Sequence, residues 1–514
     1  MKKFVFSVLF FLVLQATHAQ PSRSHAELLR GPYLQMGTST SMMVRWRTDV
    51  LVKGIVRYGS APDHLDKIAT DSMQTTEHRV NLSGLEPRGK YYYSIGSKID
   101  TLQGGPDNYF VTLPVPGTEA LYRIACVGDC GNNSVNQRNV RDQLNSYLGK
   151  NYLDAWLLMG DNTYTYGRDA EFQSNFFNVY KETLLKKYPL YPSPGNHDYN
   201  DDRTAQDTHD IAYYQIFSMP TEGQAGGVPS HNPAFYSYDF GNIHFLSLDS
   251  YGRENQLHMY DTTGAQVEWI KKDLEANKDK QWIIAYWHHP PYTMGSHNSD
   301  HEQDLVHIRE NFIQILERYG VDLVLCGHSH DYERSKLIKG HYGMEASFNP
   351  AVNLVSNSSG MYDGSANSCP YVKDSTTGNK GTVYVVAGSA GQLGGKQTSF
   401  PHEALPYSDA DHGGAGMLEI EGNRLEWKWI CADGQIRDRF TMMKNVNQRH
   451  VFTIEKGQSV LLAASFPSNQ PYKWSGGVTT TSRSIYVTPT SSKTYIVKDA
   501  SGCLQDIFEV KVTK

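Results

Sequence analysis

The chain has 514 residues, a formal net charge of −6 at pH 7 and 39% hydrophobic residues. This length exceeds what a single hydrophobic core usually supports, so we expect about three domains. The acidic balance argues against the basic surface that nucleic-acid-binding proteins carry. Six cysteines are too few for a disulfide scaffold.

Residues 1–19 predict a secretory signal peptide. Two lysines precede an apolar stretch from Phe4 to Leu14, and a small residue, Ala19, precedes the expected cleavage point. The apolar stretch is too short to span a bilayer, so a membrane anchor is the weaker alternative. We therefore expect a secreted or periplasmic protein that has no transmembrane segment.

Residues 28–114 predict a small β-sandwich. Stretches such as SMMVRWRTD and KGIVRYGS alternate apolar and polar residues at the period of a strand. A tryptophan on an early strand, followed by a Leu-x-Pro corner and a run of tyrosines, resembles a fibronectin type III domain. The segment LPVPGTE, which contains two prolines, is the expected linker to the next domain.

Residues 119–443 change to apolar strands that alternate with helical segments. The expected strands are LYRIACV, DAWLLM, YPLYPSP, QWIIAYW, VDLVLC and TVYVVA. Stretches such as GAQVEWIKKDLEANKDK have apolar residues at helical spacing. Near-continuous apolar strands are typical of sheets buried on both faces, which favours a layered α/β core. FYSYDFGNIHFLSLDS predicts an antiparallel pair.

Residues 446–514 predict a second small β-sandwich, because short alternating segments are separated by Ser, Thr and Gly turns. This sandwich resembles the immunoglobulin-like modules of exported bacterial proteins. Two cysteines of the central domain, Cys126 and Cys326, lie inside apolar runs and are expected to be small core residues. The sequence leaves the disulfide pairing open.

Polar side chains follow the expected strands at the point where each strand ends. The exits are GDCG, GDNTY, GNHD, HHPPY and GHSH. In an open α/β sheet, groups at the carboxyl ends of strands converge on one crevice, and glycine allows a tight exit. We therefore expect one cleft to gather Asp129, Asp161, Tyr164, Asn196, His197, His288, His328 and His330.

This mixture of oxygen and imidazole donors, without thiolates, suits borderline or hard transition metals. The set exceeds the need of one ion, so two ions are the economical interpretation. Two ions about 3.5–4 Å apart can clamp the attacking and leaving oxygens of a phosphoryl displacement. Each residue alone could be an ordinary turn residue; five such exits in one domain favour a metal centre. A side chain at Gly327 is expected to crowd His328 and His330.

The blocks GDCG, GDNTY, GNHD, AYWH and GHSH, in this order and spacing, resemble the signature of purple acid phosphatases within the calcineurin-like metallophosphoesterases. The resemblance covers roughly residues 28–443, including the fibronectin III-like domain. It implies a four-layer α/β sandwich in which central β-sheets are flanked by helices. It also implies an acid phosphatase that hydrolyses phosphate monoesters by attack of a metal-bound hydroxide.

The resemblance further implies two ions that share one carboxylate. The first ion takes Asp129, Tyr164 and His330, the second takes Asn196, His288 and His328, and Asp161 bridges them. The first set carries more negative charge, so it suits Fe(III), and the second suits a divalent ion such as Zn, Fe or Mn. A phenol with a pKa of about 10 ionises only beside a strong Lewis acid. Tyr164 therefore predicts a tyrosinate charge-transfer colour.

The family pattern also implies two substrate-contacting histidines. His197 resembles a phosphate-contacting histidine, and His297 matches one that could protonate the leaving alkoxide. Plant-type members carry a further histidine where this chain has Asn298, which we treat as a substrate-binding position. The general acid stays open between His297 and His301. Three other histidines are expected to be structural: His244, His289 and His412.

The sequence leaves two other functions open. One is a phosphodiesterase or nucleotidase of the same superfamily, which differs in its substrate. The other is a surface binding or adhesion protein with a vestigial site, although the complete ligand set argues against it. The expected partners are small phosphoesters and not nucleic acids. A homodimer and cell-surface contact through the C-terminal sandwich are left open.

Overall fold

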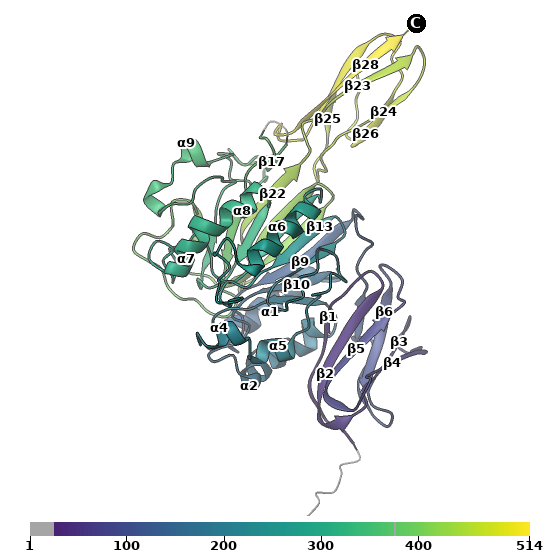
Figure 1. Cartoon of the computed structure of the whole chain (residues 1–514). Helices are drawn as coiled ribbons and strands as arrows, with labels where there is room; N and C mark the ends of the chain where they lie inside the picture. The colour runs from purple at the N-terminus through teal and green to yellow at the C-terminus, as the bar shows by residue number, and fades with distance from the viewer. Residues whose placement is uncertain (1–24, 375–376, 514) are drawn as a thin grey trace, which may run out of the picture.

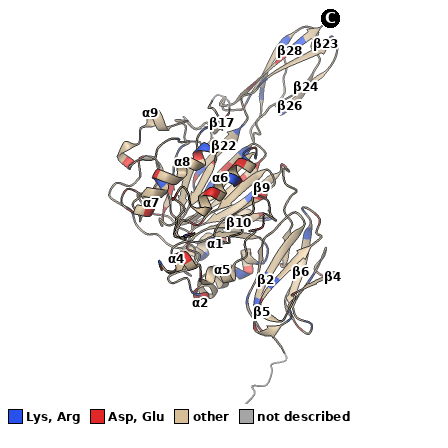
Figure 2. Cartoon of the chain, in the orientation of Figure 1, with Lys and Arg blue, Asp and Glu red and all other residues tan. Residues whose placement is uncertain are grey.

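The structure, a computed structural model, describes residues 25–374 and 377–513. The expected signal peptide, residues 1–19, lies outside the described residues. Figure 1 shows a β-rich N-terminal part, a large central part and a slender C-terminal part that projects from it. No helix among the described residues is long and apolar enough to cross a membrane. In Figure 2, Lys and Arg are interspersed with Asp and Glu over the central part.

The N-terminal part consists of two β-sheets around a shared core. The three-stranded sheet has the order β1-β2-β5, and the other has the order β4-β3-β6-β7, with β8 paired to β6. Trp46, Tyr93 and Phe110 are fully buried between them. The strands are Leu28–Gln35 (β1), Ser41–Val52 (β2), Ile55–Gly59 (β3), Lys67–Thr70 (β4), Thr75–Ser83 (β5), Lys90–Gly96 (β6), Thr101–Gln103 (β7) and Tyr109–Val111 (β8).

The central part contains two seven-stranded mixed sheets. The first has the order β11-β10-β9-β20-β21-β22-β17, in which β9, β10 and β11 run parallel. Helix α1 packs against β20 and β21. The elements are Leu121–Val127 (β9), Val135–Leu148 (α1), Ala155–Met159 (β10), Leu190–Ser193 (β11), Tyr371–Lys373 (β17), Gly414–Glu421 (β20), Arg424–Cys431 (β21) and Ile436–Lys444 (β22).

The second sheet has the order β12-β13-β14-β15-β18-β16-β19. Strands β13, β14, β15 and β18 run parallel, and β12 and β13 form the expected antiparallel pair. The elements are Tyr236–Phe240 (β12), Ile243–Ser247 (β13), Ala265–Asn277 (α6), Trp282–Tyr286 (β14), Gln303–His307 (α7), Ile313–Arg318 (α8), Leu323–Cys326 (β15), Tyr332–Arg334 (β16), Val383–Ala387 (β18) and Tyr407–Asp409 (β19).

One hydrophobic core lies between the two sheets, and a second lies under the helices. Leu157 of the first sheet and Leu325 of the second belong to the same buried cluster. Ile270 of α6 and Leu316 of α8 pack onto the outer face of the second sheet. In Figure 1, α6 and α8 lie over the sheet strands. The expected layered core with flanking helices is therefore confirmed.

Short helical segments connect these elements. The stretch 169–185 is a helix interrupted by two π-helical segments. The segments are Asp169–Glu171 (α2), Phe172–Phe177 (η1), Asn178–Tyr180 (α3), Lys181–Leu185 (η2), Ala205–Thr208 (α4), Ala212–Ile216 (α5), Ile308–Phe312 (η3), Glu345–Ser347 (η4) and Pro350–Asn353 (α9).

All six expected apolar strands form, as β9, β10, β11, β14, β15 and β18. The sequence analysis did not single out β20, β21 and β22, which complete the first sheet. In β21, for example, the polar residues Arg424, Glu426 and Lys428 alternate with buried Leu425 and Trp427. Antiparallel strands with one face that is not part of the inter-sheet core typically show this alternation.

The C-terminal part, here called the C-terminal module, consists of β23 to β28. Its sheets have the orders β23-β28-β27-β25 and β24-β26. A disulfide between Cys369 and Cys503 ties the module to the central part. Cys126 and Cys326 are buried and unpaired. The strands are Arg449–Glu455 (β23), Val460–Ala463 (β24), Lys473–Ser475 (β25), Ser484–Val487 (β26), Lys493–Lys498 (β27) and Gln505–Thr513 (β28).

Candidate metal centre

The polar strand exits meet at one edge of the two sheets. The Asp129 amide donates to the Gly160 carbonyl (3.2 Å), which joins the exits of β9 and β10. The Gly327 amide donates to the His288 carbonyl (3.0 Å), which joins the exits of β15 and β14. His288 Nδ1 donates to the Met159 carbonyl (3.0 Å) and so links the two sheets. The predicted convergence of the five exits is therefore present.

Tyr164 lies at the centre of a first group of ligand-type atoms. Its hydroxyl is 3.0 Å from Asp129 Oδ1 and 3.0 Å from His330 Nε2. His330 Nε2 is in turn 3.5 Å from Asp129 Oδ1. One carboxylate oxygen, one phenol oxygen and one imidazole nitrogen thus converge within hydrogen-bonding range of one another.

His288 lies at the centre of a second group. Its Nε2 is 3.0 Å from Asn196 Oδ1, 3.2 Å from His328 Nδ1 and 3.3 Å from Asp161 Oδ2. Because His288 Nδ1 donates to a backbone carbonyl, Nε2 is the nitrogen left for a metal ion. The Asn196 amide nitrogen donates to Asp201 (2.8 Å), which turns the Asn196 carbonyl oxygen toward His288.

Asp161 stands between the two groups. Ligand atoms of Asp129, Asp161 and His288 all lie within 4.8 Å of one another. Asp161 Oδ1 accepts the backbone N–H of His197 (2.9 Å), which leaves Oδ2 toward His288. Burial opposes ionisation of Asp161, yet His288 and His197 together hold the pKa of its carboxyl well below the usual value. A carboxylate in this position suits a bridging role.

The protonation of Tyr164 shows what this site requires. Burial, reinforced by the carboxylates of Asp129 and Asp161, raises the pKa of the phenol well above its usual value. The protein alone therefore keeps Tyr164 as a phenol. Only a strong positive charge placed among these three groups would favour the phenolate.

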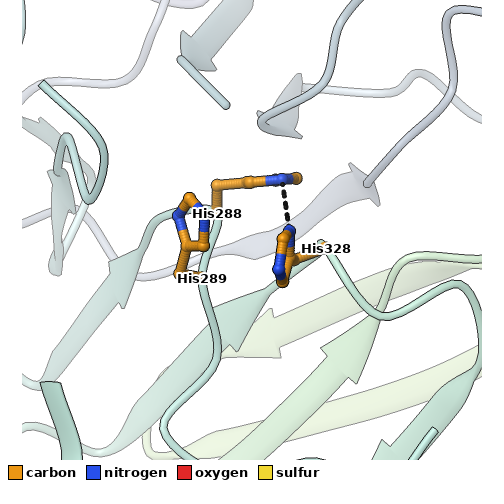
Figure 3. A group of neighbouring side chains, drawn as sticks. All are labelled: His288, His289 and His328. Carbon is orange, nitrogen blue, oxygen red and sulfur yellow. Dashed lines mark hydrogen bonds between the residues drawn. The ribbon is translucent and has the colours of Figure 1, made fainter. Parts of the chain in front are cut away.

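Imidazoles crowd around His328. Figure 3 shows the rings of His288 and His289 beside it, with a hydrogen bond between His288 and His328. Burial, followed by repulsion from His289 and then His297, lowers the pKa of His328 well below its usual value. His328 is therefore neutral, and a neutral imidazole can offer a lone pair to a metal ion.

His288 has the opposite shift. Burial lowers its pKa, but Asp161 and Asp129 outweigh burial and raise it to about 9. With carboxylates as its only counter-charges, His288 holds a proton at neutral pH. A cation bound between His288 and Asp161 would displace that proton, because metal binding and protonation compete for the same nitrogen.

His197 and His297 lie at the edge of this cluster. The His197 ring is 4.7 Å from the Tyr164 ring, and its Nδ1 donates to the Thr165 carbonyl (2.9 Å). The His297 ring stacks on His328, with 3.7 Å between ring centroids. His297 Nδ1 lies 2.9 Å from a carboxylate oxygen of Glu302. The site thus includes both predicted substrate histidines.

Four other residues that the sequence analysis names lie outside this cluster of side chains. The Asn298 side-chain oxygen accepts the N–H of Asp300 (2.9 Å), which stabilises the local turn of the backbone. His301 is exposed. His412 pairs with Asp409 (2.9 Å). His244 is fully buried between Asp239 and Asp273.

Glycines allow the close approach of the strand exits. A Cβ at Gly327 would lie 2.3 Å from Asp129 Oδ2 and 2.8 Å from the Met159 carbonyl. We expected crowding of the two imidazoles that follow; the crowded group is instead the carboxylate of Asp129. The His328 N–H donates to that same carboxylate (2.9 Å), so the close approach fixes one candidate ligand against another.

Sequence reasoning missed three residues of the site. Glu302 contacts His297 and lies 3.7 Å from His328 Nε2. Asp198 accepts N–H groups from Gly195 (2.9 Å) and from the Asn162 side chain (2.8 Å), which ties two strand exits together. His289, expected to be structural, lies 4.3 Å from His328 between ring centroids. Asp198, inside GNHD, and His289, inside HHPPY, carried a local signal, whereas Glu302 did not.

Comparisons with known proteins agree with this geometry. Residues 122–332 match the family described as calcineurin-like phosphoesterase, and residues 30–112 match the purple acid phosphatase N-terminal domain. Purple acid phosphatase 15 of Arabidopsis thaliana is 31% identical over 286 residues, which cover 51% of this chain and 50% of that protein. Purple acid phosphatase 23 of the same plant is 30% identical over 288 residues, covering 51% and 58%.

The chain spans about half the length of these curated relatives. Among solved structures, a purple acid phosphatase from yellow lupin seeds superposes with a TM-score of 0.60 at 18% identity. It covers 80% of this chain and 74% of its own, which shows a shared fold. The chain therefore resembles purple acid phosphatases, with the N-terminal domain match followed by the calcineurin-like phosphoesterase match.

Proposed function

We propose that this protein is an acid phosphatase that hydrolyses phosphate monoesters at a centre of two metal ions. The observation that carries the proposal is the pair of donor groups that Asp161 separates. The first group combines Asp129, Tyr164 and His330. The second combines Asn196, His288 and His328. When bound, the two ions would supply the Lewis acidity that activates water and neutralises the phosphoryl oxygens.

The first group is proposed to hold Fe(III) and the second a divalent ion (Zn, Fe or Mn). With the phenolate of Tyr164, the first group has two anionic ligands of its own, whereas the second has only neutral ligands besides Asp161. The raised pKa of Tyr164 supports this assignment, since a trivalent ion is the better competitor for a phenol proton.

The protein's own residues would bind and orient the phosphoryl group. His197 donates through Nδ1 to a backbone carbonyl, which leaves Nε2 as the nitrogen that can contact a phosphoryl oxygen. His297 is held through Nδ1 by Glu302, which leaves Nε2 to give a proton to the leaving alkoxide. The position of Asn298 favours a role in the shape of this loop over a substrate contact.

The setting of the enzyme is part of the proposal. We propose a fibronectin III-like domain at 28–114, the metallophosphatase domain at 119–443 and an immunoglobulin-like sandwich at 446–514. The signal peptide predicted for residues 1–19 supports secretion or a periplasmic location. Small phosphoesters are the proposed substrates. A homodimer, or cell-surface contact through the C-terminal module, is compatible with this arrangement.

Reconstitution with Fe(III) and Zn(II), followed by assays at acidic pH, tests the proposal. We expect a purple protein that releases phosphate from 4-nitrophenyl phosphate faster than it cleaves bis(4-nitrophenyl) phosphate. The reverse preference would favour the phosphodiesterase or nucleotidase alternative. A colourless protein without hydrolysis after reconstitution would leave the binding-protein alternative.

A further inference from the structure

A cavity of about 800 Å³ lies where the C-terminal module meets the central part, away from the metal centre. One wall is the face of β21 and β22 that carries Arg424 and Arg439. The second wall is the loop 361–369, and the third is formed by loops of the C-terminal module at 468–470 and 499–503. Figure 1 shows β17 and β22 leading to this junction.

The cavity is held together by covalent and polar contacts between its walls. The disulfide between Cys369 and Cys503 joins the loop to the module, and both cysteines line the cavity. The Tyr362 hydroxyl donates to Asp499 (3.0 Å), which makes a second link between the same two walls. A cavity fixed in this way is preformed, which lowers the entropy cost of binding.

The acidic side chains that line the cavity are already engaged within the protein. Asp363 accepts the N–H and hydroxyl of Ser365. Asp499 accepts the Tyr362 hydroxyl and the Leu504 N–H (2.8 Å). Glu426 pairs with Arg424. Asp499 and Glu426 are therefore not free to hold a cationic ligand, whereas exposed Asp363 keeps Oδ2 open to a ligand hydroxyl.

Of the three basic side chains that line the cavity, Arg424 and Lys428 pair with Glu426, and the third is open to a ligand. Arg424 is only 6% exposed, and its Nε is buried without a hydrogen-bond partner. Arg439 lies opposite Lys428 in the β21–β22 pair and is exposed. Among residues 25–374 and 377–513, the Arg439 guanidinium has no ion pair. A buried unsatisfied donor is costly, and an unpaired guanidinium suits a planar carboxylate.

The remaining groups in the cavity suit hydroxyl groups. The side-chain amides of Asn469 and Gln470 are exposed at the cavity and bond no other side chain in the described parts of the chain. The half-buried ring of Tyr362 gives an amphipathic surface of the kind that contacts sugar rings. A cavity of this volume holds a ligand of several rings.

From this combination we propose that the junction is a second binding site, which takes an acidic oligosaccharide. Arg439 binds a carboxylate of the sugar chain. Asn469 and Gln470 bind its hydroxyl groups. The site would hold the enzyme on uronate-rich polymers while the separate metal centre works on phosphoesters.

Calorimetric titration of the full chain with trigalacturonate tests this site. The titration is run with and without EDTA, so that any binding of carboxylates through metal ions is recognised by its dependence on metal. We expect trigalacturonate to bind and neutral maltotriose to bind at least tenfold more weakly. We expect Arg439→Ala to weaken trigalacturonate binding at least tenfold, because it removes the unpaired cation.

Arg437→Ala is the matched control. Arg437 lies on the same strand, is exposed and pairs with Asp433, and it does not line the cavity. It should bind trigalacturonate like the wild type. Absence of wild-type binding, equal affinity for maltotriose, or unchanged affinity in Arg439→Ala would each overturn the proposal. Hydrolysis of 4-nitrophenyl phosphate by Arg439→Ala should equal that of the wild type, so the outcome is independent of the proposed phosphatase activity.

Discussion

The carboxylate of Glu302 accepts a hydrogen bond from Nδ1 of His297, with 2.9 Å between the two atoms. The same carboxylate lies 3.7 Å from Nε2 of His328, whose other nitrogen points to His288. The backbone N–H of Asn298 donates to the other carboxylate oxygen of Glu302 (2.8 Å). One carboxylate thus orients the proposed general acid and lies beside one proposed metal ligand.

Glu302→Gln should therefore lower kcat by about 10- to 100-fold, the usual effect of losing a partner that orients metal ligands. Steady-state kinetics on 4-nitrophenyl phosphate across the acidic pH range would measure kcat. We also expect the acidic limb of the pH–rate profile to move. Glu310→Gln, an exposed glutamate further along the same helical region, is the control. Unchanged kcat in Glu302→Gln would contradict the positioning role.

Tyr164→Phe should remove the visible absorption band of the reconstituted Fe(III)/Zn(II) protein. The hydroxyl of Tyr164 sits between Asp129 and His330, and a phenyl ring supplies no oxygen for charge transfer to iron. A visible spectrum checks this directly. Tyr166→Phe, two residues along and half exposed, should keep the colour. A purple Tyr164→Phe protein would show that another ligand produces the band.

Gly327→Ala should displace Asp129. The added Cβ would lie 2.3 Å from Asp129 Oδ2, so either the strand exit or the carboxylate must move. We expect a loss of about 1–3 kcal/mol in the free energy of unfolding, as for other overpacked positions, and reduced iron content. Urea denaturation and metal analysis measure the two effects. Gly264→Ala, whose nearest neighbour would be 3.1 Å away, should change neither by much.

His244→Asn should destabilise the protein most at acidic pH. His244 is buried between Asp239 (2.9 Å) and Asp273 (2.6 Å), and although burial opposes it, these carboxylates raise its pKa above the usual value. A histidine whose pKa is higher in the folded than in the unfolded state stabilises the folded state when it is protonated. This stabilisation is complete below the unfolded pKa of about 6.5 and is lost as the pH rises through the folded pKa. Breaking such a buried pair costs about 3–5 kcal/mol.

Urea denaturation at pH 5.5 and pH 9 would show this difference. The variant should lose more stability at pH 5.5 than at pH 9. His231→Asn removes an exposed histidine paired with Glu222 and should have little effect at either pH. Equal destabilisation of His244→Asn at both pH values would mean that packing, not charge, is what His244 contributes.

Removal of the disulfide should loosen the C-terminal module. Cys369 and Cys503 are 134 residues apart in the sequence, so the bond closes a long loop. The double variant Cys369→Ser/Cys503→Ser should lose about 2–4 kcal/mol in the free energy of unfolding. Calorimetry would detect a lower Tm, and dithiothreitol should shift the wild type in the same way, because the other described cysteines are free and buried. A wild type unaffected by reductant would contradict this.

Local patterns in the amino-acid sequence are enough to predict which donors this protein offers. Each candidate ligand directly follows an apolar strand, and a glycine adjoins most of them, so local patterns carry both the strand and its polar exit. The parallel order of β9, β10 and β11 then brings Asp129, Asp161 and Asn196 to one edge. The same patterns predicted the apolar strands, but not β20 to β22, whose pairing depends on the neighbours they contact.

The orientation of these donors, in contrast, depends on how the elements pack against one another. Which nitrogen of His328 faces His288, and which faces Glu302, depends on residues that lie about 26 to 40 positions away in the chain. Cys369 pairs with Cys503, which lies 134 positions away in the sequence. The walls of the cavity beside the C-terminal module also come from segments that are far apart in the sequence. Such contacts leave no periodic trace in the sequence, because they are set by how separate elements pack and not by the conformation of any one of them.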